Sequence, residues 1–357
     1  GRCEWCGTEF SVVDTGGYTS NSDDIFEEEI RKQVVLAIEE AHVVLFMVEA
    51  GTGITDYDEE IAEAHRSAAI HLHDLSMLTG YCAGWSLKQL IQEGLGGVPG
   101  KITSSPAGHL STLCNQMVNF LGIMQNEWAG AQAFSSFDTY LAPFVKVDNL
   151  DYKEVKQCVQ SFIYGVNTPS RWGTQAPFSN ITLDWVVPAD LADQPAIVGG
   201  KEMDFTYGDC KKEMDMVNKA FIEIMIEGDA NGRGFQYPIP TYSITRDFDW
   251  SETENNKLLF EMTAKYGTPY FSNYINSDME PSDVRSMCCR LRLDLRELRK
   301  KSGGFFGSGE STGSVGVVTI NLPRIAYLAK TREEFYERLD KVMDIAARSL
   351  KIKRTVI

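Results

Sequence analysis

Two adjacent cysteines, Cys288 and Cys289, are the side chains of this sequence best suited to chemistry. Arg285, Arg290 and Arg292 lie close to them in the chain, and nearby positive charge lowers the pKa of a thiol and makes its sulfur more reactive. Free cysteine is also one of the residue types most often buried as a small apolar side chain. The doublet alone therefore leaves two interpretations open, a reactive thiol or part of a core.

Two predicted strands flank the doublet. Residues 267–274 begin with Gly-Thr-Pro and continue with aromatic side chains, which predicts a turn that leads into a short strand. Residues 313–322 form an apolar run with glycines, rich in β-branched residues and too short for a helix, which predicts a buried strand. The two thiols therefore lie in the connection between two strands.

Further candidate residues precede the doublet. His71 and His73 lie in a segment that alternates polar and apolar residues, as a half-buried strand does. On one face of a strand they can bind a metal or hydrogen-bond inside a core, and no third ligand is spaced nearby. Ser104 and Ser105 can donate to a phosphate or a ribose, but serine before proline is also typical of a turn. Cys82, taken by itself, fits a core position.

The other predicted elements alternate between helix and strand, which favours a parallel α/β architecture. Helical spacing predicts one or two buried helices over 109–140 and helices over 149–165, 203–227 and 331–350. Residues 235–245 alternate as a strand does, and the two prolines in this segment, Pro238 and Pro240, place it at a strand end.

Several long motifs resemble those of the anaerobic (class III) ribonucleoside-triphosphate reductases. In chain order they are HLHDL at 71–75, GYCAGWSL at 80–87, GGVPGK at 96–101, EWAGAQAFSSF at 127–137, RSMCCRL at 285–291 and TINLPR at 319–324. The resemblance covers about residues 61–357, with residues 266–324 similar to the finger loop of that family. It implies an α/β fold, the ten-stranded α/β barrel of the glycyl-radical reductases, present here in incomplete form.

The resemblance also implies roles for individual residues. A thiyl radical on Cys289 would remove the 3′ hydrogen of a ribonucleoside triphosphate, and Cys82 would supply the second thiol as the 2′ hydroxyl leaves as water. The resemblance assigns no role to Cys288. The residues implied in substrate binding are His71, His73, Ser104, Ser105 and Asn321.

The family's cofactors and partners follow from the same resemblance. They are a glycyl radical, dNTP and ATP effectors, a radical-SAM activating enzyme and a second copy in a homodimer. Some members carry an asparagine and use formate where this chain has Ser314 and Val315, which leaves formate or a dithiol protein as the reductant. The family's glycyl-radical loop and four-cysteine zinc site do not occur before Ile357, so the polypeptide is expected to be inactive alone.

Residues 1–60 resemble part of the first G domain of the tandem-domain ribosome-assembly GTPases, a P-loop α/β segment. Asp14 and Gly17 match its Asp-x-x-Gly loop, but neither a Gly-x-x-x-x-Gly-Lys-Ser/Thr phosphate loop nor an Asn-Lys-x-Asp motif is present. We therefore expect no GTP hydrolysis. A GTP-binding protein and a non-catalytic remnant remain the alternatives, and a fused or misassembled reading frame near residue 60 is a hypothesis.

Composition limits the remaining functional classes. The formal net charge is −16, from 50 acidic and 34 basic residues, which opposes binding to a nucleic-acid backbone. The sequence has no apolar run long enough for a bilayer and no signal-peptide pattern, so a cytoplasmic protein is predicted. Cys3 and Cys6 form a Cys-x-x-Cys pair without a second pair, so no zinc site is expected there.

Overall fold

The computed structural model describes residues 2–5, 8–11, 56–75, 77–96, 103–168, 176–277 and 312–357. Strands β1 (Arg2–Trp5) and β2 (Thr8–Ser11) form an antiparallel pair. Asp14 and Gly17 of the GTPase-like segment and the doublet Cys288-Cys289 lie outside these residues. The chain divides into two compact units: unit 1 contains residues 1–79 and 315–357, and unit 2 contains residues 80–314.

Unit 2 is built on a six-stranded sheet in the order β10-β9-β6-β5-β4-β11. Five strands pair in parallel: β4 (Ala83–Trp85), β5 (Gln132–Phe134), β6 (Ser179–Leu183), β9 (Ile239–Ile244) and β10 (Tyr270–Asn273). The sixth, β11 (Thr312–Gly313), is antiparallel to β4. The predicted parallel α/β architecture is therefore confirmed, whereas the ten-stranded barrel and the P-loop segment stay predictions.

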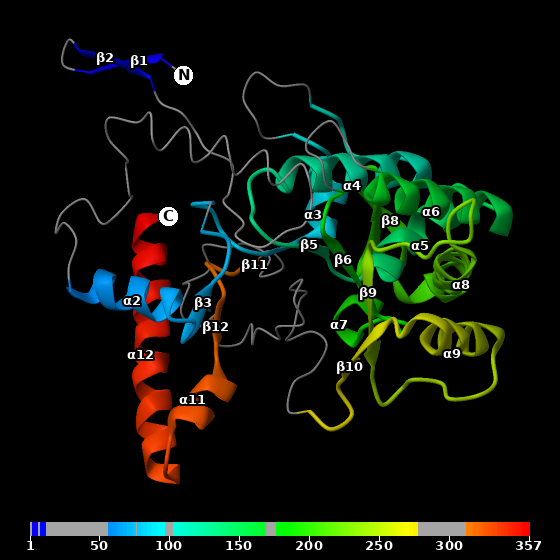
Figure 1. Cartoon of the computed structure of the whole chain (residues 1–357). Helices are drawn as coiled ribbons and strands as arrows, with labels where there is room; N and C mark the ends of the chain where they lie inside the picture. Colours follow the sequence, from blue (N-terminus) through cyan, green and yellow to red (C-terminus); the bar gives the residue numbers. More distant parts are fainter. Residues whose placement is uncertain are drawn as a thin grey trace. The chain divides into compact units, whose positions relative to one another are not determined.

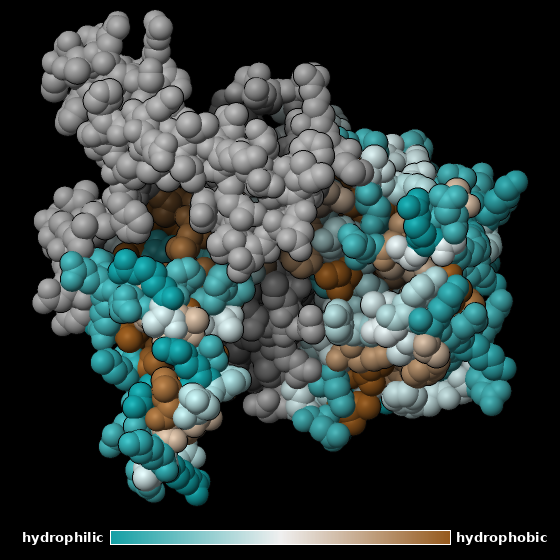
Figure 2. Space-filling view, viewed as in Figure 1, coloured by the Kyte–Doolittle hydropathy of each residue, from teal (hydrophilic) through white to brown (hydrophobic). Residues whose placement is uncertain are grey.

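Helices connect the parallel strands, and Figure 1 shows α4, α6 and α8 together on one side of this sheet. The helices of unit 2 are α3 (Leu87–Glu93), α4 (Leu110–Met124), α5 (Phe137–Val147), α6 (Tyr152–Asn167), α7 (Ala189–Ala192), α8 (Lys211–Glu227) and α9 (Glu254–Tyr266). Side-chain caps define several of their starts; in α6, Asp151 and Glu154 form a reciprocal capping box. On the face seen in Figure 2, hydrophilic residues predominate on the outer surfaces of these helices.

Two of the predicted elements of unit 2 were wrong in their bounds or type. The apolar stretch 109–140 contains strand β5 between α4 and α5, because Gln132–Phe134 pairs on both sides with neighbouring strands. The start of the predicted helix 203–227 is strand β8 (Lys201–Thr206), which pairs with β7 (Pro195–Val198), and the α-helix itself covers residues 211–227. The two prolines of the segment 235–245 lie at the start of β9, at a strand end as predicted, and β9 is an inner strand between β6 and β10.

Unit 1 combines segments from two distant parts of the chain. Strand β3 (Ile70–Leu72) pairs antiparallel with β12 (Val318–Ile320), and helices α2 (Asp56–Arg66), α11 (Leu322–Leu328) and α12 (Arg332–Val356) complete it. Ile61, Ile70 and Ile345 form its buried core, and Arg348 donates to Glu60 at 2.8 Å. The single strand predicted over 313–322 is therefore two short strands, β11 and β12, with different partners.

No helix in the described part of the chain is both long and apolar enough to cross a membrane. The helices instead bury one side against a sheet or against each other, as in an ordinary α/β core.

A buried carboxylate, Asp138, ties helix α5 to the end of strand β6. It accepts hydrogen bonds from the backbone N–H of Asp184 at 2.8 Å, from that of Trp185 at 2.9 Å and from the Asn218 amide at 2.9 Å. Asp138 is fully buried, and burial raises its pKa above the ordinary value although these hydrogen bonds act in the opposite direction. Three elements therefore depend on one side chain.

We expect Asp138→Ala to destabilise the protein strongly, because three buried donors would lose their acceptor. The cost should be roughly 3–5 kcal/mol, measured by denaturant unfolding. Asp247→Ala, at an exposed position, should change stability by less than about 0.5 kcal/mol. Equal effects of the two substitutions would contradict the proposed role of Asp138.

The raised pKa of Asp138 also predicts a pH dependence. The pKa of Asp138 is higher in the folded protein than in the unfolded chain, so the protonated carboxyl favours folding. This contribution to the free energy of unfolding is fully present at pH values below the pKa in the unfolded chain. It is lost as the pH rises through the pKa in the folded protein. The stability of the wild type relative to Asp138→Asn, which cannot ionise, should therefore fall between acidic and neutral pH. A difference that is constant with pH would show that the carboxyl pKa is not raised.

Candidate functional site

The six-stranded sheet of unit 2 has two faces of different character. One face packs on the main hydrophobic core and carries Phe134, Ile181, Leu183, Tyr242 and Ile244. Because side chains alternate along a strand, the residues between these point to the other face, here called the polar face. Its members are Cys82, Gly84, Ala131, Ala133, Asn180, Thr182, Thr241, Ser243 and Ser314.

Cys82 lies in the most tightly packed part of the polar face. It is 1% exposed and forms a small buried cluster with Ala131 and Ala133, separate from the main core. A side chain on Gly130 would bring its Cβ within 2.6 Å of the Cys82 sulfur, so only glycine leaves room for the thiol there. The other members of the cluster are thus two alanines, with the half-buried Tyr81 packed against them.

Ser314 lies directly beside Cys82, although 232 residues separate them in the chain. The N–H of Cys82 donates to the Ser314 hydroxyl at 3.2 Å, and the N–H of Ser314 donates to the Cys82 carbonyl at 2.9 Å. These bonds extend the pairing of β11 with β4 by one residue. Ser314, which lies within the finger-loop-like region 266–324, is thereby fixed against the strand that carries the Cys82 thiol.

Asn180 and Thr241 contribute polar groups two and three strands away from Cys82. Asn180 is 2% exposed, and its Nδ2 donates to the Thr241 hydroxyl at 3.4 Å. The Asn180 Oδ1 is buried and has no hydrogen-bond partner in the part of the chain that the structure describes. Sequence reasoning missed both residues, although the alternation in Ser-Asn-Ile-Thr-Leu at 179–183 indicated a strand with one polar face.

His71 and His73 belong to unit 1, where they form part of a histidine cluster. Their rings lie 4.6 Å apart between centroids, and the His65 ring lies 5.4 Å from that of His71. His73 Nε2 and the Thr319 hydroxyl are hydrogen-bonded at 2.8 Å. Burial and the neighbouring His71 lower the pKa of His65, which favours its neutral form.

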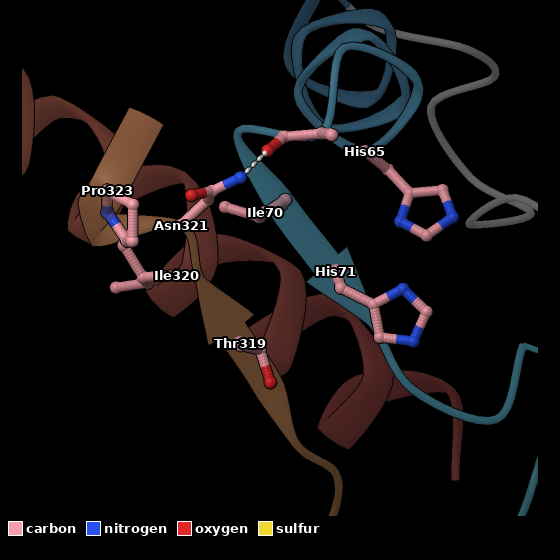
Figure 3. Close-up of a pocket in the computed structure, with 8 residues that line it drawn as sticks. His65, Ile70, His71, Thr319, Ile320, Asn321 and Pro323 are labelled. Atoms are coloured by element: carbon pink, nitrogen blue, oxygen red, sulfur yellow. Dashed lines mark hydrogen bonds between the residues drawn. The ribbon is translucent and has the colours of Figure 1, made fainter. Parts of the chain in front are cut away.

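A cavity of about 360 Å³ lies beside this cluster and is lined by His65, His71, Thr319 and Asn321, among others. Figure 3 shows the His65 and His71 rings side by side at this cavity. Within the described residues, no group of three histidine, cysteine or acidic side chains has a geometry that could hold a metal ion. The cluster is thus held by hydrogen bonds and ring contacts.

Asn321 lines the same cavity, but backbone groups engage both polar atoms of its side chain. Its Nδ2 donates to the Ala68 carbonyl at 3.0 Å (Figure 3), and its Oδ1 accepts from the Arg324 N–H at 3.0 Å. It therefore caps helix α11 and fastens that helix to the segment between α2 and β3. These two hydrogen bonds stabilise the start of helix α11, so Asn321 has a structural role that is separate from any role in binding.

Ser104 and Ser105 lie in unit 2 and make the contacts of a turn. The Gln116 amide donates to the Ser104 hydroxyl at 2.7 Å and to the Ser105 carbonyl at 2.8 Å. Ser104 also forms an isolated bridge with Leu95. Gln116 is 3% exposed, so this turn is fixed from beneath by a buried side chain.

The sequence-predicted residues thus fall into two groups. Cys82, Ser104 and Ser105 are in unit 2, and His71, His73 and Asn321 are in unit 1. Cys288 and Cys289 lie outside the described residues.

Residues 1–75 match the model of the 50S ribosome-binding GTPase family. GTPase Der of Bacteroides thetaiotaomicron is 63% identical over 68 residues, which are 19% of this chain and 16% of that protein. Der of Bacteroides fragilis is 60% identical over 68 residues, with the same coverage. This likeness is confined to a small part of either protein.

The solved structures of the Thermotoga maritima anaerobic ribonucleotide reductase share the fold. The complex with dATP and CTP gives a TM-score of 0.62 at 22% identity, over 84% of this chain and 49% of that one. The form with citrate in the active site also gives 0.62 at 22% identity, over 84% and 53%. The chain therefore spans about half the length of these reductases.

The model of the anaerobic ribonucleoside-triphosphate reductase family matches residues 47–357 and overlaps the GTPase match at residues 47–75. Since this match includes every strand of the six-stranded sheet and the whole of the polar face, the chain belongs to the anaerobic ribonucleoside-triphosphate reductase family.

Proposed function

We propose that this chain is the catalytic-barrel part of an enzyme that reduces ribonucleoside triphosphates to 2′-deoxyribonucleoside triphosphates. One observation carries the proposal: a buried thiol, Cys82, stands among very small residues on the polar face of a parallel sheet in a chain of the reductase family. Small neighbours let a sugar approach a sulfur closely, and burial keeps water away from reactive intermediates.

In the proposed reaction, the sulfur of Cys289 removes the 3′ hydrogen atom of the ribose. The C2′–O bond then breaks, and the hydroxyl leaves as water with a proton from the Cys82 thiol. The reductant, formate or a dithiol protein, supplies two electrons, C2′ takes up a hydrogen in place of the lost hydroxyl, and a proton restores the Cys82 thiol. The 3′ hydrogen then returns from Cys289 to C3′. When present, the family's glycyl radical supplies the unpaired electron.

The remaining residues have binding roles in this proposal. Contacts with the substrate are proposed for His71, His73, Ser104, Ser105 and Asn321. The five parallel strands and the antiparallel β11 support a half-barrel that a second set of strands would complete. The dNTP and ATP effectors, the radical-SAM activating enzyme, the homodimer and the cytoplasmic location belong to the same proposal.

Substitution of either thiol should abolish the reaction. In a polypeptide that joins residues 61–357 to the glycyl-radical segment of a family member, Cys289→Ala and Cys82→Ala should each reduce deoxynucleotide formation below detection. The reason is that each sulfur performs a step that no neighbour can replace. The product is measured by chromatography of labelled nucleotides.

Cys158 provides the matched control for these substitutions. It is a half-buried free cysteine on helix α6, and burial raises its pKa, which opposes thiolate chemistry. Cys158→Ala should retain turnover. Deoxynucleotide formation by the Cys289→Ala protein would refute the assignment of the thiyl site.

A GTP-binding function is the second candidate, and the likeness of residues 1–75 to the GTPase family favours it. It predicts tight, Mg²⁺-dependent binding of GTP that is lost in Asp14→Ala. Because the phosphate loop is absent from this sequence, we expect Asp14→Ala to leave the binding of labelled GTP unchanged. Loss of binding in this variant would support the GTPase-like function, since GTP bound as a reductase substrate would not depend on Asp14.

A further inference from the structure

Asn180 holds a buried amide oxygen on the polar face. Its side chain is 2% exposed, and its Oδ1 has no hydrogen-bond partner among the described residues. Several other buried side-chain atoms there share this state, but Asn180 Oδ1 is the one on the face that carries Cys82. Burying an amide oxygen without a partner costs roughly 1–3 kcal/mol, so proteins rarely leave such an atom unpaired without a reason. The Thr241 hydroxyl accepts from the amide Nδ2 at 3.4 Å, which orients the free oxygen.

The position of Asn180 relates this atom to Cys82. In the sheet register, Gly84 lies opposite Ala133 and Ala133 lies opposite Asn180, on the same face as Cys82. Neighbouring strands are about 4.8 Å apart, so Asn180 on β6 lies about 10 Å from Gly84 on β4, the strand that begins directly after Cys82. Ala131 and Ala133 lie between them and have the smallest side chains that a strand offers next to glycine. Cys82 and Asn180 therefore lie on one face with only methyl groups between them.

The chemistry of the neighbours selects the kind of ligand group. Asn180 Oδ1 is a neutral acceptor, and the polar-face residues near it, Thr241 and Ser243, carry hydroxyls without charge. The polar face as defined above contains no lysine or arginine, the side chains that favour a phosphate. An acceptor of this kind pairs with a hydroxyl or an amino group of the ligand.

We propose that Asn180 Oδ1 accepts a hydrogen bond from a ribose hydroxyl of the bound nucleotide, with Thr241 as the positioning residue for the amide. The inference depends on the proposed function, because it takes the ligand to be a ribonucleotide. Of the two possible donors to Asn180, a ribose hydroxyl is present in every ribonucleotide, whereas an exocyclic amino group is not. Asn180 thereby acts as a binding residue that senses the sugar of the substrate.

Binding measurements on the full chain test this inference. Calorimetry with CTP, 2′-deoxy-CTP and 3′-deoxy-CTP gives a dissociation constant for each nucleotide. Asn180→Ala should weaken CTP roughly tenfold, because one hydrogen bond to a buried group is lost. It should leave the affinity for the analogue that lacks the contacted hydroxyl unchanged, and that analogue identifies the hydroxyl.

Ser179→Ala is the matched control, since Ser179 is the preceding residue, is equally buried and points to the opposite face. It should bind all three nucleotides as the wild type does. Asn180→Ser, which keeps a small polar group, provides a second variant if Asn180→Ala proves unstable by thermal unfolding. Thr241→Val should give the same pattern of loss as Asn180→Ala with a smaller amplitude.

The outcomes separate this inference from the proposed function. If the wild type binds no nucleotide, the proposed function fails and the role of Asn180 fails with it. If the wild type binds CTP but Asn180→Ala and Asn180→Ser bind it equally well, only the inference is overturned. Equal weakening of CTP and both deoxy analogues would likewise overturn it, because a general distortion of the site does not depend on one hydroxyl.

Discussion

The alternation of side chains along five parallel strands is the constraint on which the rest of unit 2 depends. Residues such as Ile181 and Leu183 must meet the helices, and this requirement fixes the register of β6 against its neighbours. A shift by one residue would turn Asn180 and Thr182 into the apolar core. The same register that builds the core therefore places the polar residues and Cys82 on one opposite face.

Both faces of the sheet carry buried polar groups. On the helix side, Asp138 receives three hydrogen bonds, and Thr139 donates to Asp184 at 2.6 Å. Among the described residues, buried side-chain atoms without a hydrogen-bond partner occur on both sides, for example Tyr242 OH on the helix side and Asn180 Oδ1 on the polar face. What distinguishes Asn180 is therefore its place on the face that carries Cys82, because an unpaired atom by itself does not mark a binding site.

Sequence patterns predicted the elements with local signals and missed those defined by distant partners. The strand over residues 267–274 and the helix over 149–165 were found because proline, aromatic residues and helical spacing mark them. Strand β5 was missed because three residues carry no periodicity of their own, and only pairing with β4 and β6 makes them a strand. Cys82 was found through a family motif, whereas Asn180 required knowledge of which atoms remain unpaired.

The surroundings of Ser314 bear on the proposed reductant. Family members that use formate carry an asparagine in this region, whose amide extends further from the backbone than a serine hydroxyl does. Here the Ser314 hydroxyl already accepts from the Cys82 N–H at 3.2 Å, so its short side chain is committed to the strand pairing that holds β11 against β4. Position 314 is therefore used to hold β11 against β4, and the asparagine amide that formate-using members carry in this region is replaced here by a hydroxyl bonded to the Cys82 backbone.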